Sequence, residues 1–178
     1  MIDSFRGDYN FLSDFYPAET WYRGIKYASS EHAYMSAKSD DNRWKMFCAD
    51  SSNRASLVKA KSYELGGLLR EDWVHVKYMV MFECLQSKFS QEPLRQQLID
   101  TKGEYLKEGN DWGDAYWGVD VVHGGENNLG KVLMSLRESF RTFKYVEVKE
   151  IAEEFADARV GGYRGTFKNW EEVLRVNK

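Results

Sequence analysis

Two residues whose side chains could do chemistry stand seven positions apart in the segment YASSEHAYMSAK, which spans residues 27–38. Seven helical residues advance about 700°, about 20° short of two full turns, so Glu31 and Lys38 fall on one face of a helix. Because helical side chains lean toward the N-terminus, the lysine reaches back toward the glutamate, with Met35 between them. A carboxyl group and an amine placed in this way suit acid and nucleophilic catalysis. The same spacing also suits an exposed charged stripe.

A second cluster lies in the glycine-rich stretch GNDWGDAYWGVD. It interleaves acids with aromatic rings: Asp111, Asp114, Asp120, Trp112, Tyr116 and Trp117. Cleavage of a glycosidic bond to a planar base needs such groups, because a carboxylate stabilises the oxocarbenium-like sugar while rings hold the base. In the alternative reading, the aspartates make local backbone bonds in a turn and the tryptophans pack in the core. Spacing alone leaves both readings open.

The remaining reactive side chains follow no metal or cofactor pattern. The histidines His32, His75 and His123 lack ligand spacing, and no P-loop, GxSxG or Rossmann signature is present, so we expect no metal site and no cofactor. His75 is expected to be a core or edge residue, and His123 is a further candidate acid. Cys48 and Cys84 lie far apart in the sequence, which suits a reducing compartment.

The chain contains only two prolines, so long helices are permitted through most of the sequence. We expect the elements that position these residues to be mostly helical. Short strands are expected at residues 2–5 and 20–27, on either side of the FLSDFYP loop. Periodicity predicts helices over about 30–39, 41–49, 52–64, 72–89, 93–101 and 129–143. Ser29 or Ser30 can cap the first of these, and Asp72 the fourth. The wide apolar stripe of the fourth helix predicts a central, largely buried position.

Residues 102–126 are rich in glycine and show little periodicity, and such a long irregular segment in a compact domain is often functional. Beyond it, the C-terminal part reads as a charged helix, a glycine hinge and a short final helix from about residue 168. We therefore expect a mainly α (α+β) fold. It comprises one domain over residues 1–144, with a few short β-strands near the N-terminus, and a helical extension over 145–178 packed on the same domain.

Composition excludes several classes of function. The chain has 178 residues, a size typical of one domain, and a formal net charge of −3, so it offers no large basic face for duplex nucleic acid. A single modified nucleotide could still be a substrate. Aromatic residues make up 15%, enough to line a pocket for planar ligands. Without a signal-peptide pattern or a long apolar run, we expect a cytoplasmic protein and no membrane partner.

Several segments together resemble the NADAR family of YbiA-like proteins, over roughly residues 1–140. In chain order they are FLSDFYP, WYRGIKYASSEHAYMSAK, REDWVHVKYMVMFECLQSKF, DAYWGVD and GENNLGKVLMSLRE. The resemblance implies a YbiA-like helical domain and an N-glycosidase that cleaves a bond between a base and a ribose, in the form of ribose phosphate or ADP-ribose. Activities known in the family act on phosphoribosylamino-pyrimidine intermediates of riboflavin synthesis, or on ADP-ribosylated guanine in DNA.

The resemblance also implies the residues of the site. The catalytic residues would be Glu31, Lys38, Asp114 and Trp117. The substrate-binding residues would be Ser13, Asp14, Phe15, Tyr16, Met35, Gly118, Asn127 and Arg137. In a purely structural reading, Asn127 caps a helix and Arg137 pairs with a carboxylate. The implied partner is a small nucleotide or an ADP-ribosylated base, including one carried on a nucleic acid, and the oligomeric state stays open.

A mechanism follows from this resemblance. Asp114 or Glu31 would stabilise the ribose cation or protonate the leaving base, and Trp117 would stack on the base or the ribose. If the ribose ring opens, a neutral Lys38 could attack C1′ and form a Schiff base that water hydrolyses. Lys38 must first lose its proton, so partial burial would be needed to lower its pKa.

Two positions depart from the family pattern. Asp14 stands where an asparagine is common, and Met35 stands where a glutamine often follows the glutamate by four residues. The first adds a carboxylate beside the ligand and the second removes an amide, so both bear on substrate identity. Two further hypotheses compete with a glycosidase: a non-catalytic module that binds ADP-ribose or a related nucleotide, and a structural domain that binds a partner through its C-terminal helix.

Overall fold

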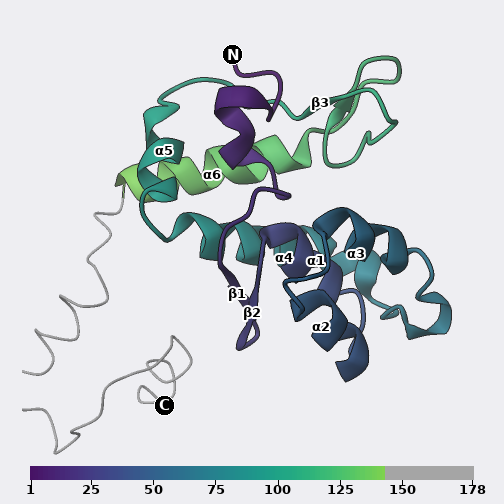
Figure 1. Cartoon of the computed structure of the whole chain (residues 1–178). Helices are drawn as coiled ribbons and strands as arrows, with labels where there is room; N and C mark the ends of the chain where they lie inside the picture. The colour runs from purple at the N-terminus through teal and green to yellow at the C-terminus, as the bar shows by residue number, and fades with distance from the viewer. Residues whose placement is uncertain (143–178) are drawn as a thin grey trace, which may run out of the picture. The chain divides into compact units, whose positions relative to one another are not determined.

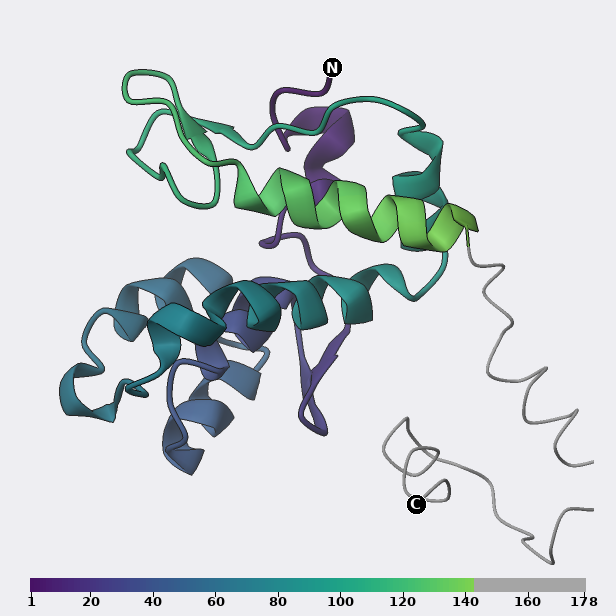
Figure 2. The same ribbon diagram turned by 180° about the vertical axis from the view of Figure 1, so that it is seen from behind.

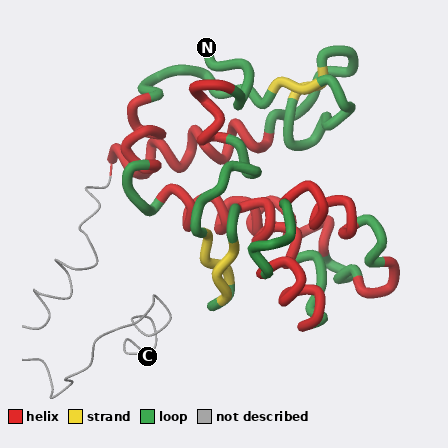
Figure 3. The backbone as a smooth tube through the Cα atoms, in the orientation of Figure 1, coloured by secondary structure: helices red, strands yellow, loops and turns green. Residues whose placement is uncertain are grey.

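The computed structural model describes residues 1–142. The described chain is mainly helical, with two small two-stranded sheets (Figure 3), which confirms the expected mainly α (α+β) class. The charged helix, glycine hinge and final helix expected in the extension over 145–178 lie outside the described residues. No helix in residues 1–142 is both long and apolar enough to cross a membrane.

The N-terminal segment is less regular than the sequence predicted. The prediction of a strand at residues 2–5 is wrong, because Ile2 forms only an isolated parallel bridge with Leu106. A 3-10 helix, η1 (Gly7–Leu12), follows. The strand region expected at 20–27 is confirmed as an antiparallel hairpin of β1 (Thr20–Tyr22) and β2 (Ile25–Tyr27). The hairpin turns through Arg23 and Gly24, which both adopt positive φ angles, 49° and 78°.

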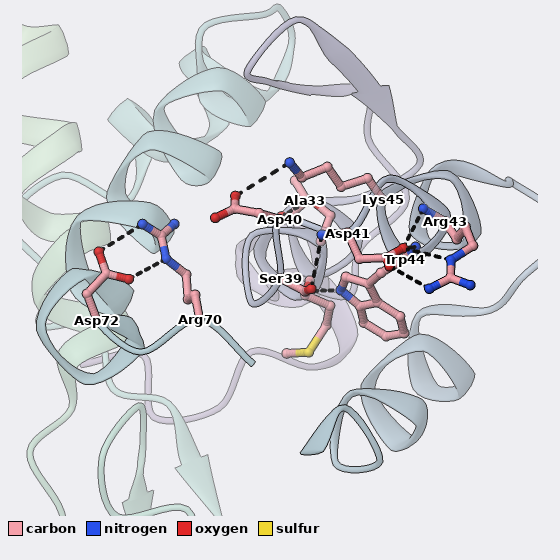
Figure 4. Close-up of polar contacts among 11 residues, drawn as sticks. Ala33, Ser39, Asp40, Asp41, Arg43, Trp44, Lys45, Arg70 and Asp72 are labelled. Carbon is pink, nitrogen blue, oxygen red and sulfur yellow. Dashed lines mark hydrogen bonds and ion pairs between the residues drawn. The ribbon is translucent and has the colours of Figure 1, made fainter. Parts of the chain in front are cut away.

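Three short helices follow the hairpin: α1 (Ser30–Ser36), α2 (Asn42–Ala49) and α3 (Ala55–Ser62). Helices α1 and α3 are shorter than predicted. Helix α1 stops early because the backbone N–H of Lys38 bonds to the carbonyl of Met35, three residues back, which closes a tight turn. Helix α2 begins where Oδ1 of Asp41 accepts bonds from the N–H groups of Arg43 and Trp44, at 2.7 and 3.2 Å (Figure 4).

The longest helix, α4 (Trp73–Phe89), follows a 3-10 turn, η2 (Gly66–Leu68). Asp72 does not cap it with its side chain as expected, because its carboxylate is bound by Arg70 (Figure 4). The prediction of a largely buried helix holds only for its second half, since Val74 and Met79 near its start are exposed. The predicted later helices are confirmed as α5 (Leu94–Asp100) and α6 (Asn128–Thr142).

These helices pack in two groups joined by α4 and α6. Helix α1 contacts α2, α3 and α4, while α4 also packs on β1 and α6, and α5 packs on α6. The apolar core runs along these contacts and includes Met81, Leu85, Phe89, Leu133 and Leu136. Helix α3 and the glycine-rich loop lie at the same end of α4 and α6 in both views (Figures 1 and 2). Residues from the two segments selected in the sequence, 27–38 and 109–120, line one cavity at this end of the molecule.

The glycine-rich segment contains a small parallel sheet that the sequence analysis did not anticipate. Its strands are β3 (Gly109–Asn110) and β4 (Val119–Asp120). Side-chain bonds to the backbone hold the residues between them: Asn110 donates to the carbonyl of Asp114 at 2.8 Å and accepts from its N–H at 3.0 Å. Local side-chain bonds of this kind replace the hydrogen-bond ladder of a longer strand.

Candidate active site

One cavity of about 800 Å³ gathers most of the residues expected to do chemistry. Its walls come from the FLSDF loop, α1, α3, the start of α4 and the glycine-rich segment. All four predicted catalytic residues line it, and so do four of the predicted substrate-binding residues. The eight are Glu31, Lys38, Asp114, Trp117, Ser13, Asp14, Phe15 and Met35.

The N-terminus of α1 positions Glu31. Ser29 caps the helix by accepting a bond from the N–H of His32. The His32 ring lies between the Ser29 hydroxyl, at 2.8 Å, and the carbonyl of Asn53, at 2.9 Å, so this histidine secures the helix start. The backbone carbonyl of Asp14 accepts from the N–H of Glu31 at 2.9 Å, which ties the FLSDF loop to the same turn.

The carboxyl group of Glu31 is only 1% exposed. Its Oε1 has no hydrogen-bond partner within residues 1–142 and lies 3.8 Å from Nζ of Lys59. Burial raises the pKa of Glu31 well above its usual range, and the nearby carboxyl of Asp14 raises it further, against the opposing charges of Lys59 and Lys38. Glu31 therefore holds a proton at a pH where an exposed glutamate has lost it.

Lys38 lies just beyond the last residue of α1, yet it lines the same cavity as Glu31. Its Nζ donates to Oγ of Ser62 at 2.9 Å, and that hydroxyl donates onward to the carbonyl of Lys59 at 2.7 Å. The amine lies 5.3 Å from the centre of the Tyr63 ring. Burial lowers the pKa of Lys38, against the opposing charge of Glu31. The expected partial burial of this amine is present.

Lys59, on α3, belongs to the site, although the sequence analysis did not select it. It pairs with Glu31 and lies 5.1 Å from the centre of the Phe15 ring. Burial alone lowers its pKa, but the negative charges of Glu31 and Asp14 outweigh that effect and the pKa is raised overall. Lys59 thus stays positively charged beside Lys38. No local signal identified it, because a lysine within an alternating polar helix looks like any solvated residue.

The loop acid Asp114 lines the cavity but also organises its own turn. Its Oδ1 accepts bonds from the N–H groups of Tyr116, at 3.1 Å, and Trp117, at 2.8 Å. The turn bonds of the alternative reading are therefore present, and the catalytic role of Asp114 stays a prediction. Asp120 is different: it bonds to the N–H groups of Gly113, Val122 and His123, and these bonds hold its pKa down to about 2. It does not line the cavity.

The aromatic residues divide into packed and open rings. The Trp117 ring meets the Tyr34 ring edge-on at 5.5 Å and the Tyr116 ring edge-on at 5.0 Å between centroids. Trp112, by contrast, is 55% exposed, lines the cavity and has the guanidinium of Arg6 at 5.5 Å from its ring centre. Trp112 therefore offers an open face for a planar ligand, whereas Trp117 is fixed by its neighbours.

Glu108 is a second glutamate in the cavity that sequence reasoning missed. Burial raises its pKa to about 7, and the negative charge of Asp14 contributes to the rise. It precedes the GNDWG stretch by one residue, but a glutamate in the sequence LKEGN carries no recognisable signal.

Four predicted substrate-binding residues do not line this cavity: Tyr16, Gly118, Asn127 and Arg137. Asn127 is held within the chain, where its amide donates to the carbonyl of Leu106 at 2.8 Å and accepts from the N–H of Glu108 at 3.0 Å. It therefore clamps the loop and does not cap α6 in the usual way. Arg137 donates to Thr101 and to the carbonyl of Glu104, both at 2.8 Å, and among residues 1–142 no carboxylate accepts a bond from it.

Gly118 and Tyr16 also support neighbouring parts of the site. A Cβ at Gly118 would lie 2.5 Å from both the Asn110 amide nitrogen and the carbonyl of Glu108, so only glycine fits. The Tyr16 ring lies 5.4 Å from Nζ of Lys88. Lys88 is fully buried and donates to the carbonyl of Ser13 at 2.6 Å, which holds the FLSDF loop, and burial lowers its pKa to about 7.

The remaining candidates have smaller roles. Met35 is 2% exposed and lines the cavity, and its carbonyl accepts a bond from the Trp44 indole at 2.9 Å. His123 lies beside Asp120 at 2.8 Å and does not line the cavity. Within residues 1–142, no group of three or more His, Cys, Asp or Glu side chains could hold a metal ion.

Comparison with known proteins places these features in context. The NADAR domain model matches residues 4–141. The N-glycosidase YbiA of Escherichia coli is 35% identical over 136 residues, covering 74% of this chain and 81% of that protein. An N-glycosidase of Nostoc punctiforme is 31% identical over 140 residues, covering 75% and 86%.

A riboflavin biosynthesis protein of Vibrio vulnificus is 34% identical over 135 residues, covering 75% of this chain but only 36% of that longer protein. The chain therefore spans about a third of this relative. Among solved structures, the NMR structure of the Escherichia coli protein YbiA superposes with a TM-score of 0.67 and 28% identity, covering 92% of this chain and 94% of that one.

Proposed function

This chain belongs to the NADAR domain family, whose named relatives include N-glycosidases, and on that premise we propose that it hydrolyses the bond between C1′ of a phosphorylated ribose and a base. One observation carries the proposal: a buried glutamate with a raised pKa and a half-buried lysine with a lowered pKa line one cavity. The raised pKa favours a Glu31 that gives a proton, and the lowered pKa makes it easier for Lys38 to lose the proton it must lose before it attacks.

The first step opens the sugar ring. Glu31 gives its proton to the ring oxygen O4′ as the C1′–O4′ bond breaks, and the base nitrogen shares its electron pair with C1′ to form an iminium. The carboxylates of Asp14 and Asp114 line the same cavity and stabilise this positive charge. This route suits a phosphoribosylamino-pyrimidine well, because its glycosidic nitrogen is an exocyclic amine with a lone pair to share.

The second step exchanges one amine for another. The neutral nitrogen of Lys38 adds to C1′, a proton passes from that nitrogen to the base nitrogen, and the bond from C1′ to the base breaks. The base leaves as a neutral amine and Lys38 holds the sugar as an iminium. Water then adds to C1′ and gives one proton to Glu31; the second proton passes from the new hydroxyl to the lysine nitrogen, and the C1′–lysine bond breaks to release the open-chain sugar as an aldehyde.

The charges around the cavity favour a substrate that carries phosphate. Besides Lys38, the cationic residues Arg6, Lys59 and Lys77 line it. Lys59 stays protonated because of its acidic neighbours, so it can bind an anion without losing its charge. A ribose phosphate and an ADP-ribose both meet this requirement, and the base could be free or part of a nucleic acid strand.

The test is incubation of the protein with a phosphoribosylamino-pyrimidine and, separately, with ADP-ribosylated guanine, followed by chromatography for free base. We expect release from at least one substrate by the wild-type protein, and little or none by Glu31→Gln or Lys38→Met. The exposed residue Glu71 supplies a matched control, since Glu71→Gln lies outside the cavity. Binding of both compounds without any release of base would overturn the proposal in favour of a nucleotide-binding module.

A further inference from the structure

Two carboxyl oxygens in the cavity wall are buried and have no hydrogen-bond partner within residues 1–142: Oε1 of Glu31 and Oε2 of Glu108. An unpartnered buried oxygen costs stability, and in native proteins it often marks a function. The mechanism above uses Glu31 and leaves Glu108 without a role. Glu108 is therefore the group in this cavity whose unmet hydrogen bond requires an explanation.

The backbone on both sides of Glu108 is fixed by specific contacts. Asn127 accepts from the N–H of Glu108 at 3.0 Å and donates to the carbonyl of Leu106 at 2.8 Å. The carbonyl of Glu108 accepts from the N–H of Val119 at 2.8 Å. Gly118 leaves room for this close approach, because a Cβ there would meet that carbonyl at 2.5 Å. A backbone held so firmly fixes the point from which the Glu108 side chain extends, and this favours a ligand site that is formed before the ligand binds.

The surroundings of Glu108 indicate which part of a ligand it meets. The charges of four residues act on its carboxyl group, in decreasing order Asp14, Arg6, Asp114 and Lys59. Arg6 also lies over the ring of Trp112, the open aromatic face of the cavity. A carboxyl group repels phosphate, so the phosphate end of the ligand belongs elsewhere, near the lysines. Arg6 acts on Glu108 more strongly than Lys59 does and also lies over Trp112, so we place Glu108 at the end of the cavity where this ring can hold the base.

From this placement we propose that Glu108 binds the leaving base, by accepting hydrogen bonds from N–H groups on the edge of its ring while Trp112 stacks on its face. The ligand class is an amino-substituted pyrimidine or purine, whose ring edge carries N–H donors. Enzymes that act on a single base commonly read it by such edge bonds together with stacking. This inference deepens the proposed N-glycosidase function and rests on it.

The experiment compares Glu108→Gln with the wild-type protein and with Glu71→Gln. It measures kcat/KM for release of the base and, separately, the affinity for ribose 5-phosphate, which lacks a base. At pH 8, above the pKa of about 7 of Glu108, we expect Glu108→Gln to lower kcat/KM about 10- to 100-fold, the effect of losing a hydrogen bond to a charged group. Binding of ribose 5-phosphate should stay within about twofold of wild type, as should both measurements for Glu71→Gln.

A second measurement does not depend on any variant folding. A substrate analogue whose edge N–H is replaced by N–CH₃ should react with wild-type protein about 10- to 100-fold more slowly than the parent compound. Unchanged kcat/KM in Glu108→Gln, an equal loss of ribose 5-phosphate binding, or full activity on the methylated analogue would each overturn the role of Glu108. If wild-type protein releases no base at all, the proposed function fails first, so the two failures are distinguishable.

Discussion

The cavity has two walls that position reactive groups in different ways. The helical wall, formed by Glu31, Lys38 and Lys59, presents side chains from or just beyond short helices, and these groups shift one another's pKa values through space. The loop wall, formed by Glu108, Asp114 and Trp117, depends on side-chain bonds to the backbone.

The acidic residues of the two walls fall into two kinds: those that hold their own turn by hydrogen bonds, and those with an oxygen available to a ligand. Asp114 and Asp120 bond to the N–H groups of their own turns, so much of their hydrogen-bonding capacity is already used. Glu31 in the helical wall and Glu108 in the loop wall each keep a buried oxygen that has no hydrogen-bond partner among residues 1–142. We infer that chemistry and recognition depend most on these two glutamates.

The largest expected effect comes from Glu31→Gln, which removes the acid from the helical wall while nearly preserving its shape. The rate of base release should fall about 1,000-fold, within the range for loss of a general acid. Single-turnover assays measure this directly, with Glu71→Gln as the matched control. A rate within about threefold of wild type would show that the proton comes from elsewhere.

The next largest effect should come from Asn127→Gly, which disturbs the loop wall without touching the cavity. Asn127 has a φ angle of 56°, which glycine adopts readily, so the variant removes mainly the side-chain bonds. We expect base release to fall about 10- to 100-fold and the free energy of unfolding to fall by about 1–3 kcal/mol. Urea titration measures the stability, and Asn128→Ala at the neighbouring position serves as control. A drop in stability without a drop in kcat/KM would limit Asn127 to a structural role.

A smaller effect distinguishes the two roles of Asp114. Asp114→Asn keeps the oxygen that accepts from Tyr116 and Trp117 but loses the charge, whereas Asp114→Ala loses both. If the main role of Asp114 is to hold its turn, kcat/KM of the asparagine variant should stay within about tenfold of wild type. The kcat/KM of the alanine variant should then be about tenfold lower than that of the asparagine variant. Equal losses in the two variants would instead assign the effect to the charge.

The smallest expected effect concerns stability and pH at Glu108. Its pKa of about 7 in the folded protein exceeds the unfolded value, so the folded state keeps a proton that the unfolded state loses. Stability contributed by this group is therefore lost as the pH rises from about 4.5 to 7. Glu108→Gln should be more stable than wild type by about 1–3 kcal/mol at pH 8, and equal to it near pH 4. Denaturant titration at both values checks this, and an equal difference at both would contradict it.

Sequence patterns predicted the helical wall better than the loop wall. The Ser29 cap and most helices follow from local signals, whereas the prediction that Glu31 and Lys38 share a helix face is wrong, because α1 ends at Ser36; the two residues line one cavity all the same. Lys59 was missed because its relation to Glu31 arises only when α3 packs on α1. Glu108 and Asn127 depend on contacts between residues far apart in the chain, such as the bonds from Asn127 to the segment 106–108, which no local pattern records.

The proposed mechanism depends most on a covalent bond between Lys38 and the sugar. The direct test is borohydride reduction of the protein during turnover, followed by peptide mass spectrometry. We expect a stable sugar adduct on the peptide containing Lys38, absent from Lys38→Met and absent when borohydride is added without substrate. Release of base with no adduct, or an adduct on Lys59 instead, would contradict it.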